Sequence, residues 1–169
     1  MISDISAKHI ENRTIPILVG FLPDVAPGRD QVDDRLRYYW TLQFLKKLCL
    51  SPHLTVTLFI RLTTKLDLVS SPQLSNDEIT DPECTAAYMY SILNCLADAI
   101  ELKIKAGHTD LSKLGDRFIT KLFNLSFSLA IPVLRCIPRD SFPKLLLVIG
   151  RIITPIVRVL PVEYVLVYL

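Results

Sequence analysis

Cysteine and histidine are the residue types in this chain best suited to nucleophilic catalysis or zinc binding, so their spacing is the first question. The cysteines are far apart, and no C-x-x-C pair occurs. The histidines are also scattered, and none has a ligand-type residue four positions further on, as a helical zinc site would need. We therefore expect buried, reduced thiols and no metal site. The residues concerned are Cys49, Cys84, Cys95, Cys136, His9, His53 and His108.

Acidic side chains suited to general acid–base catalysis are not paired in a useful way. Asp33 and Asp34 are adjacent, so on a helix they point in different directions. Asp77 and Glu78 have no basic or metal-binding residue nearby in the sequence. Signatures of phosphate-binding loops, dinucleotide-binding folds, serine hydrolases and zinc proteases are absent from the sequence. We predict that the protein is not an enzyme and uses no cofactor.

Basic side chains form the most ordered set of candidate binding residues. Three of them recur every fourth residue and three every seventh, so each set lines one side of a helix. If the two helices are neighbours, the rows could merge into a basic ridge for an acidic protein surface or for phosphates. The alternative is that both rows are simply the solvated faces of two apolar helices. The candidate partner-binding residues are Lys113, Arg117, Lys121, Lys144, Arg151 and Arg158.

The overall charge gives little support for strong nucleic-acid binding. The formal net charge is +2, and no recognised nucleic-acid motif is present. The charge is uneven, however. Residues 61–100 hold two basic and six acidic side chains, whereas residues 101–169 hold ten basic and five acidic ones. We therefore expect a protein partner, with nucleic acid as a less favoured alternative.

The chain is apolar, and this raises the question of a membrane. Half of its 169 residues are hydrophobic, and the mean hydropathy is +0.37. The longest uncharged runs are shorter than the ~18 residues that a bilayer-spanning helix needs. The N-terminus has no basic region before an apolar core, so a secretory signal is not expected. We predict an intracellular protein of the cytoplasm or nucleus, without a transmembrane segment and not secreted.

The elements that must position these residues are best defined between residues 14 and 48. Ile15, Leu18, Val19 and Leu22 follow a helical period, and a polar turn ends that first helix. A second helix over 31–48 has one apolar stripe. Helical hairpins of this kind are expected to stack side by side. The stripe consists of Val32, Leu36, Tyr39, Trp40 and Phe44.

This hairpin resembles a HEAT repeat. In that family, helix A carries a proline, the turn carries an aspartate, and a valine and an arginine open helix B. The matching positions here are Pro16, Asp24, Val32 and Arg35. The resemblance implies an all-α solenoid of the HEAT/armadillo type, with stacked antiparallel hairpins. It also implies protein binding through a concave helix face rather than chemistry. Three to four repeats of roughly 39 residues would fit the chain.

The rest of the chain continues the helical pattern as one repeat domain over residues 1–169. Prolines and polar caps predict helices over 52–67, 84–105, 109–130 and 144–160. Residues 69–82 read as an acidic flexible loop, with partner binding as the sharper alternative. The apolar tail, residues 162–169, lacks a polar cap. We expect a longer array or self-association through this C-terminal edge.

Together these patterns favour a non-enzymatic protein–protein interaction scaffold. Two alternatives remain open at the level of sequence. The high apolar content and the basic rows also suit a peripheral, lipid-associated helical protein. A compact helical bundle that serves as an oligomerisation domain would have a similar composition.

Overall fold

The structure is a computed structural model, and its described part is entirely made of helices and their connections. No strand occurs within that part, so the predicted all-α class is confirmed. The described residues are 8–48, 52–70, 81–105, 116–129, 131 and 139–158.

Six α-helices and two short helices of other types follow one another in the described part. The short ones are a π-helix, η1, and a 3₁₀-helix, η3. In chain order the elements are η1 (Ile10–Thr14), α2 (Ile15–Gly20), α3 (Val32–Lys47), α4 (Pro52–Ser70), α5 (Pro82–Lys105), α6 (Asp116–Phe127), η3 (Arg139–Ser141) and α8 (Phe142–Arg158).

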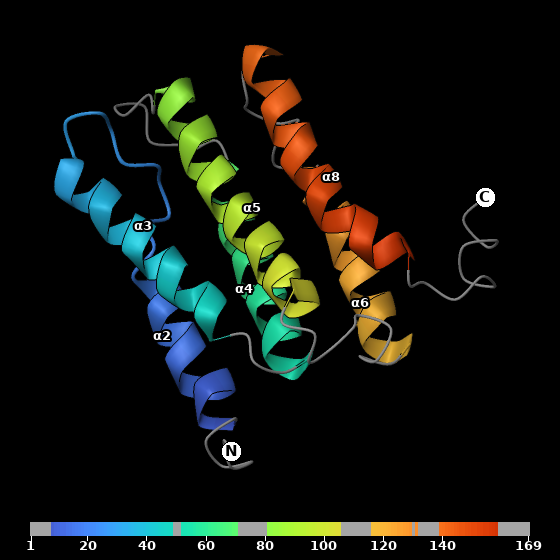
Figure 1. The fold of residues 1–169 in the computed structure, drawn as a ribbon. Helices are drawn as coiled ribbons and strands as arrows, with labels where there is room; N and C mark the ends of the chain where they lie inside the picture. The colour runs from blue at the N-terminus through green and yellow to red at the C-terminus, as the bar shows by residue number, and fades with distance from the viewer. Residues whose placement is uncertain are drawn as a thin grey trace.

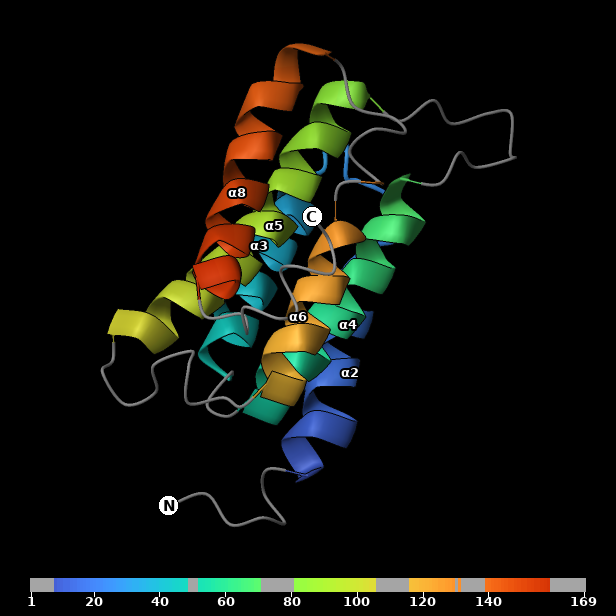
Figure 2. The same ribbon diagram turned by 90° about the vertical axis from the view of Figure 1, so that its right-hand side faces the viewer.

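The six α-helices form two layers of three. One layer contains α3, α5 and α8, and the other contains α2, α4 and α6, as the side view shows (Figure 2). Each helix of the second layer packs on the helix that follows it in the first layer, and the two run in opposite directions (Figure 1). The result is a stack of three antiparallel hairpins: α2/α3, α4/α5 and α6/α8. The predicted solenoid-like stacking is confirmed.

Local sequence explains where the longer helices begin. Pro52 and Pro82 occupy the first position of α4 and α5, where the missing N–H has no helical partner to lose. Asp81 caps α5 by accepting a 3.0 Å hydrogen bond from the backbone N–H of Glu83. That hydrogen bond lowers the pKa of Asp81, and Arg29 adds to the effect. Helix α5 thus begins at Pro82, and the start predicted from the sequence, residue 84, is two residues late.

The core lies between the layers and is centred on α5. This helix packs against α3, α4 and α8, so most of its surface is covered. Its fully buried side chains occur at nearly every turn. They include Tyr88, Met89, Ile92, Leu93, Leu96, Ala97 and Ile100.

The apolar stripe of α3 that the sequence singles out is not the face that packs in the stack. All five stripe residues are exposed, with Trp40 at 66 %. The inward face of α3 is formed by Tyr38, Leu42 and Leu45. The Tyr38 ring meets the Tyr88 ring edge to face, with 4.7 Å between their centroids. Both faces of α3 are apolar, and the stack covers one of them.

The stacked hairpins agree with a helical-repeat type, but the details of a HEAT repeat are not reproduced. Asp24 lies in the turn between α2 and α3, as the resemblance implies, whereas Val32 and Arg35 are exposed. The hairpins begin at residues 15, 52 and 116, so a regular period of about 39 residues is not observed.

Several predicted features lie wholly or partly outside the described residues. Helix α4 extends to Ser70 and α5 begins at Pro82, so both ends of the expected acidic loop are helical. The stretch 71–80 between them is not described, and neither is the tail, 162–169. The loop and the C-terminal edge therefore stay predictions. The last predicted helix, 144–160, is observed as α8.

Candidate functional site

The basic residues predicted to bind a partner have different surroundings in the described part of the chain. Helices α6 and α8 do pack together, as the prediction required. Arg117 and Lys121 are exposed on α6, and Arg158 is exposed on α8. Lys144 lies over the Tyr90 ring of α5, 4.1 Å from its centroid. Lys113 lies outside the described residues, so its place in the row stays a prediction.

Arg151 is half-buried and is held against α5 by polar residues of that helix. Its guanidinium donates to Glu101 Oε1 at 2.8 Å, to Asp98 Oδ1 at 3.2 Å and to Asn94 Oδ1 at 2.8 Å. The hydrogen bond to Glu101 is the main reason that the pKa of Arg151 is raised. Arg151 and Lys144 thus both contact α5, and the merged basic ridge stays a prediction.

Asp98 connects all three hairpins. Its Oδ2 lies 3.1 Å from Lys46 Nζ of α3, while its Oδ1 accepts from Arg151 of α8. We call Lys46, Asp98, Arg151 and Glu101 the ion-pair ladder. The ladder cancels part of the charge imbalance seen along the sequence, because an acid of the negative segment pairs with a base of the positive one. Its role is to join helices, and its members are not free to bind a partner.

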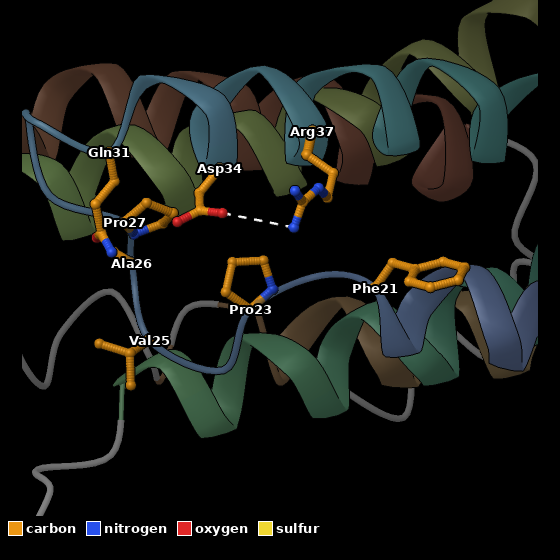
Figure 3. A pocket seen from close by; sticks show the side chains of 8 residues that line it. All are labelled: Phe21, Pro23, Val25, Ala26, Pro27, Gln31, Asp34 and Arg37. Atoms are coloured by element: carbon orange, nitrogen blue, oxygen red, sulfur yellow. Dashed lines mark ion pairs between the residues drawn. The ribbon is translucent and has the colours of Figure 1, made fainter.

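The first hairpin, in contrast, leaves a groove at the end of the stack, which we call the α2–α3 groove. Its volume is about 280 Å³. Phe21 and Pro23 form one wall, and the side chains of Asp34 and Arg37 reach over it from α3 (Figure 3). Arg37 Nη1 lies 3.6 Å from Asp34 Oδ1. The full lining is Phe21, Pro23, Val25, Ala26, Pro27, Gln31, Asp34 and Arg37.

The turn that lines this groove is fixed by the middle hairpin. Lys65 of α4 is buried and donates to the Leu22 carbonyl at 2.9 Å and to Asp24 Oδ1 at 2.5 Å. Tyr88 of α5 donates its hydroxyl proton to the Pro23 carbonyl at 2.7 Å. Burial is the main cause of the raised pKa of Tyr88, so the hydroxyl stays protonated as a donor. The groove is therefore a preformed feature of the fold.

The outer face of α3 borders this groove. We use the name α3 outer face for the exposed stripe Val32, Leu36, Tyr39, Trp40 and Phe44. The Tyr39 and Trp40 rings meet edge to face, with centroids 5.5 Å apart. Large exposed apolar patches of this kind mark interaction surfaces in soluble proteins.

The sequence contained a signal for this surface, although the groove itself was missed. Apolar residues Tyr38, Leu42 and Leu45 form a second stripe on α3, opposite the one that was singled out. A helix with two apolar faces needs two partners, and among the described residues the first hairpin packs on one neighbouring hairpin. The groove residues gave no pattern, because they come from a turn and from two helices.

The structure describes two of the cysteines, Cys84 and Cys95, and two of the histidines, His9 and His53. Cys95 is buried, and its thiol donates to the Leu42 carbonyl at 3.3 Å, as expected for a buried thiol. Cys84 is half-buried, and its Sγ lies 3.6 Å from Asp81 Oδ2. No cluster of three or more potential metal ligands occurs among the residues that the structure describes. His9 and His53 are exposed.

Comparison with known proteins gives one result. A family model with the description "RNAPII transcription regulator C-terminal" (MMS19_C) matches residues 41–165. Neither the curated proteins nor the solved structures gave a match. Within the described residues, no helix is both long enough and apolar enough to cross a membrane.

The match runs from the second half of α3 through α4, α5, α6 and α8. The α2–α3 groove and most of the α3 outer face precede it, so the family description does not account for them. Because the match covers well over half of the sequence, the chain belongs to the RNAPII transcription regulator C-terminal family.

Proposed function

We propose that this chain is a non-enzymatic scaffold that binds another protein through the α2–α3 groove. The observation that carries the proposal is the groove itself. It combines an exposed aromatic ring, Phe21, with a charged rim formed by Asp34 and Arg37. Its turn is held by hydrogen bonds from the buried side chain of Lys65 and from the Tyr88 hydroxyl. Such preformed sites bind with a smaller ordering cost than flexible ones.

The chemistry of the groove favours a short apolar segment that carries an acidic residue. Phe21 and Pro23 offer apolar contact, and the Arg37 guanidinium can donate to a carboxylate in place of Asp34. The family description further supports a role in the regulation of RNAPII transcription, and therefore a nuclear or other intracellular location. A HEAT-like mode of action through helical hairpins is part of the same proposal.

Binding is favoured over catalysis because the partly buried charges serve as joints between helices. The ion-pair ladder links α3, α5 and α8, and Lys65 holds the first turn. Both sets carry hydrogen-bond partners that they would have to give up in order to act on a substrate.

Quantitative affinity capture from nuclear extract tests the proposal. The full chain is compared with a groove variant, Phe21→Asp with Arg37→Glu, and with a matched variant in the third hairpin, Leu147→Asp with Arg139→Glu. All four positions are exposed, so both proteins should fold. We expect at least one protein whose recovery falls more than about tenfold with the groove variant alone, as for loss of a binding hot spot.

The captured protein is then purified and titrated directly against the same three chains. Weaker binding by the groove variant, with unchanged binding by the matched variant, would support the groove. Equal recovery of every protein by all three chains would remove the groove from the account. A variant at Arg117 and Lys121 of α6, both changed to Glu, tests in the same assay the partner-binding residues predicted from sequence.

A further inference from the structure

The α3 outer face is an uncovered apolar row whose centre is Trp40. Leu36 lies four residues before Trp40, and Phe44 lies four residues after it, so the three lie along one helical ridge. All three are more than half exposed. Ridges of this spacing are the features by which helices pack against each other. The row therefore has the form of a helix-packing surface without a helix on it in the described structure.

The size of this row corresponds to the apolar part of a stable interface. A fully buried aromatic side chain removes about 150–250 Å² from solvent. The row has three aromatic and two aliphatic residues, all of them exposed, and their exposed parts add up to roughly 500 Å². Stable interfaces bury about 800 Å² per partner, and somewhat over half of that area is apolar. Trp and Tyr, which are the residue types enriched among interface hot spots, lie at its middle.

The charges that flank the row are arranged symmetrically about the same residue. Asp33 lies seven residues before Trp40, and Lys47 lies seven residues after it. Both side chains are exposed, and neither has an ion-pair partner among the residues that the structure describes. Their neighbours Asp34 and Lys46, by contrast, pair within the chain. Asp33 and Lys47 are thus available for a partner.

We propose that two copies of this chain associate through α3, antiparallel, about a twofold axis at Trp40. In this register, Trp40 meets the partner's Trp40, and Leu36 of each copy lies opposite the partner's Phe44. Asp33 of each copy faces the partner's Lys47, which gives two equivalent ion pairs. A twofold interface requires a self-complementary patch, and a row with opposite charges at equal distances from its centre meets that requirement. The inference is independent of the proposed function, because it does not use the α2–α3 groove.

The chain contains a single tryptophan, Trp40, and its fluorescence gives a direct test. We expect the emission maximum of the full chain to move to longer wavelength on dilution, as the dimer separates and the indole becomes hydrated. Sedimentation equilibrium over the same concentrations should give a dimer mass that falls to that of the monomer. A monomer at every concentration up to ~1 mM, a range that reaches the weakest interfaces, would overturn the proposal.

Two substitutions separate the proposed interface from general apolar association. Leu36→Glu should weaken the dimer at least thirtyfold, because it places an unpaired charge in the apolar row of both copies. Leu147→Glu is the matched control, since Leu147 is 70 % exposed on α8 at the other end of the stack. It should leave the dissociation constant unchanged. An equal loss with both variants would show non-specific association and would overturn the proposal.

Charge exchange tests the antiparallel register. Asp33→Lys alone and Lys47→Glu alone each place like charges opposite each other twice, so each should weaken self-association about tenfold. An equimolar mixture of the two variants should form a heterodimer near wild-type strength, because each copy then supplies what the other needs. The chain carrying both changes should also dimerise. Single variants that dimerise normally, or a mixture that is not rescued, would overturn the register.

Discussion

Helices α3 and α5 lie side by side in the same layer, yet their environments differ sharply. Helix α5 contacts helices on three sides, and the polar side chains of its remaining side bind the flanking helices. Helix α3 buries Tyr38, Leu42 and Leu45 and exposes an equally apolar row. The comparison teaches that the place of a helix in the stack determines which of its apolar faces is covered. The pattern of the helix itself does not.

The polar residues of the two helices make the same point. In α5, Asn94, Asp98 and Glu101 all bond to Arg151 of α8. In α3, Asp33 and Lys47 have no such neighbour in the described structure. The middle hairpin thus pairs these polar groups with its neighbours, whereas the first hairpin leaves Asp33 and Lys47 unpaired in the described structure.

The largest expected difference in stability comes from changing one leucine to alanine in each of the two helices. Leu96→Ala in α5 removes a fully buried side chain and should lower the free energy of unfolding by about 2–5 kcal/mol. Leu36→Ala in α3 removes a side chain that is 52 % exposed, so the free energy of unfolding should change by less than about 0.5 kcal/mol. Urea denaturation followed by circular dichroism, at protein concentrations below the dimer range, measures both. Similar losses would mean that the α3 outer face is covered in solution.

The next largest effect concerns the joint between the first and middle hairpins. Lys65→Met keeps the apolar stem but removes the donor to Leu22 and Asp24, so stability should fall by about 2 kcal/mol. The loss should also loosen the turn that lines the α2–α3 groove. Hydrogen exchange of the amides over residues 21–27 would detect this. Unchanged exchange over residues 21–27 would show that Lys65 does not hold the turn that lines the groove.

Tyr88→Phe should cost about 1 kcal/mol at neutral pH, because the Pro23 carbonyl loses its donor. The pH dependence gives a second signature. Folding raises the pKa of Tyr88 above the unfolded value of 10.0, so its contribution is complete below pH 10 and is lost as the pH rises beyond it. The wild type should therefore lose stability more steeply than the variant above pH 10. Parallel curves for the two proteins would contradict the assignment.

The smallest effect is expected at the ion-pair ladder. Asp98→Asn keeps the shape of the side chain and weakens the bonds to Lys46 and Arg151, both of which are partly exposed. Solvent screening limits the loss to about 0.5–1 kcal/mol, and high salt should reduce it further. Thermal melts in low and high salt measure this difference. A salt-independent loss above 2 kcal/mol would mean that the ladder behaves as a buried network.

The sequence was sufficient for the helices because their signals are local. Pro52 and Pro82 mark helix starts, and apolar periods mark helix bodies. The sites were not predictable in the same way, because they depend on distant residues. Arg151 looked available until the fold brought Asp98 and Glu101 to it. The groove combines a turn with α3, and nothing in its residue order indicates that it is hollow.

One carboxylate gives this stack an unexpected mechanical property. Asp98 holds Lys46 of the first hairpin on one oxygen and Arg151 of the third on the other. Any bending at either junction between hairpins must lengthen a bond to this same group, or rotate it away from its second partner. The two junctions between hairpins therefore share one carboxylate, which couples their curvature in addition to the packing of α4 and α5 against their neighbours.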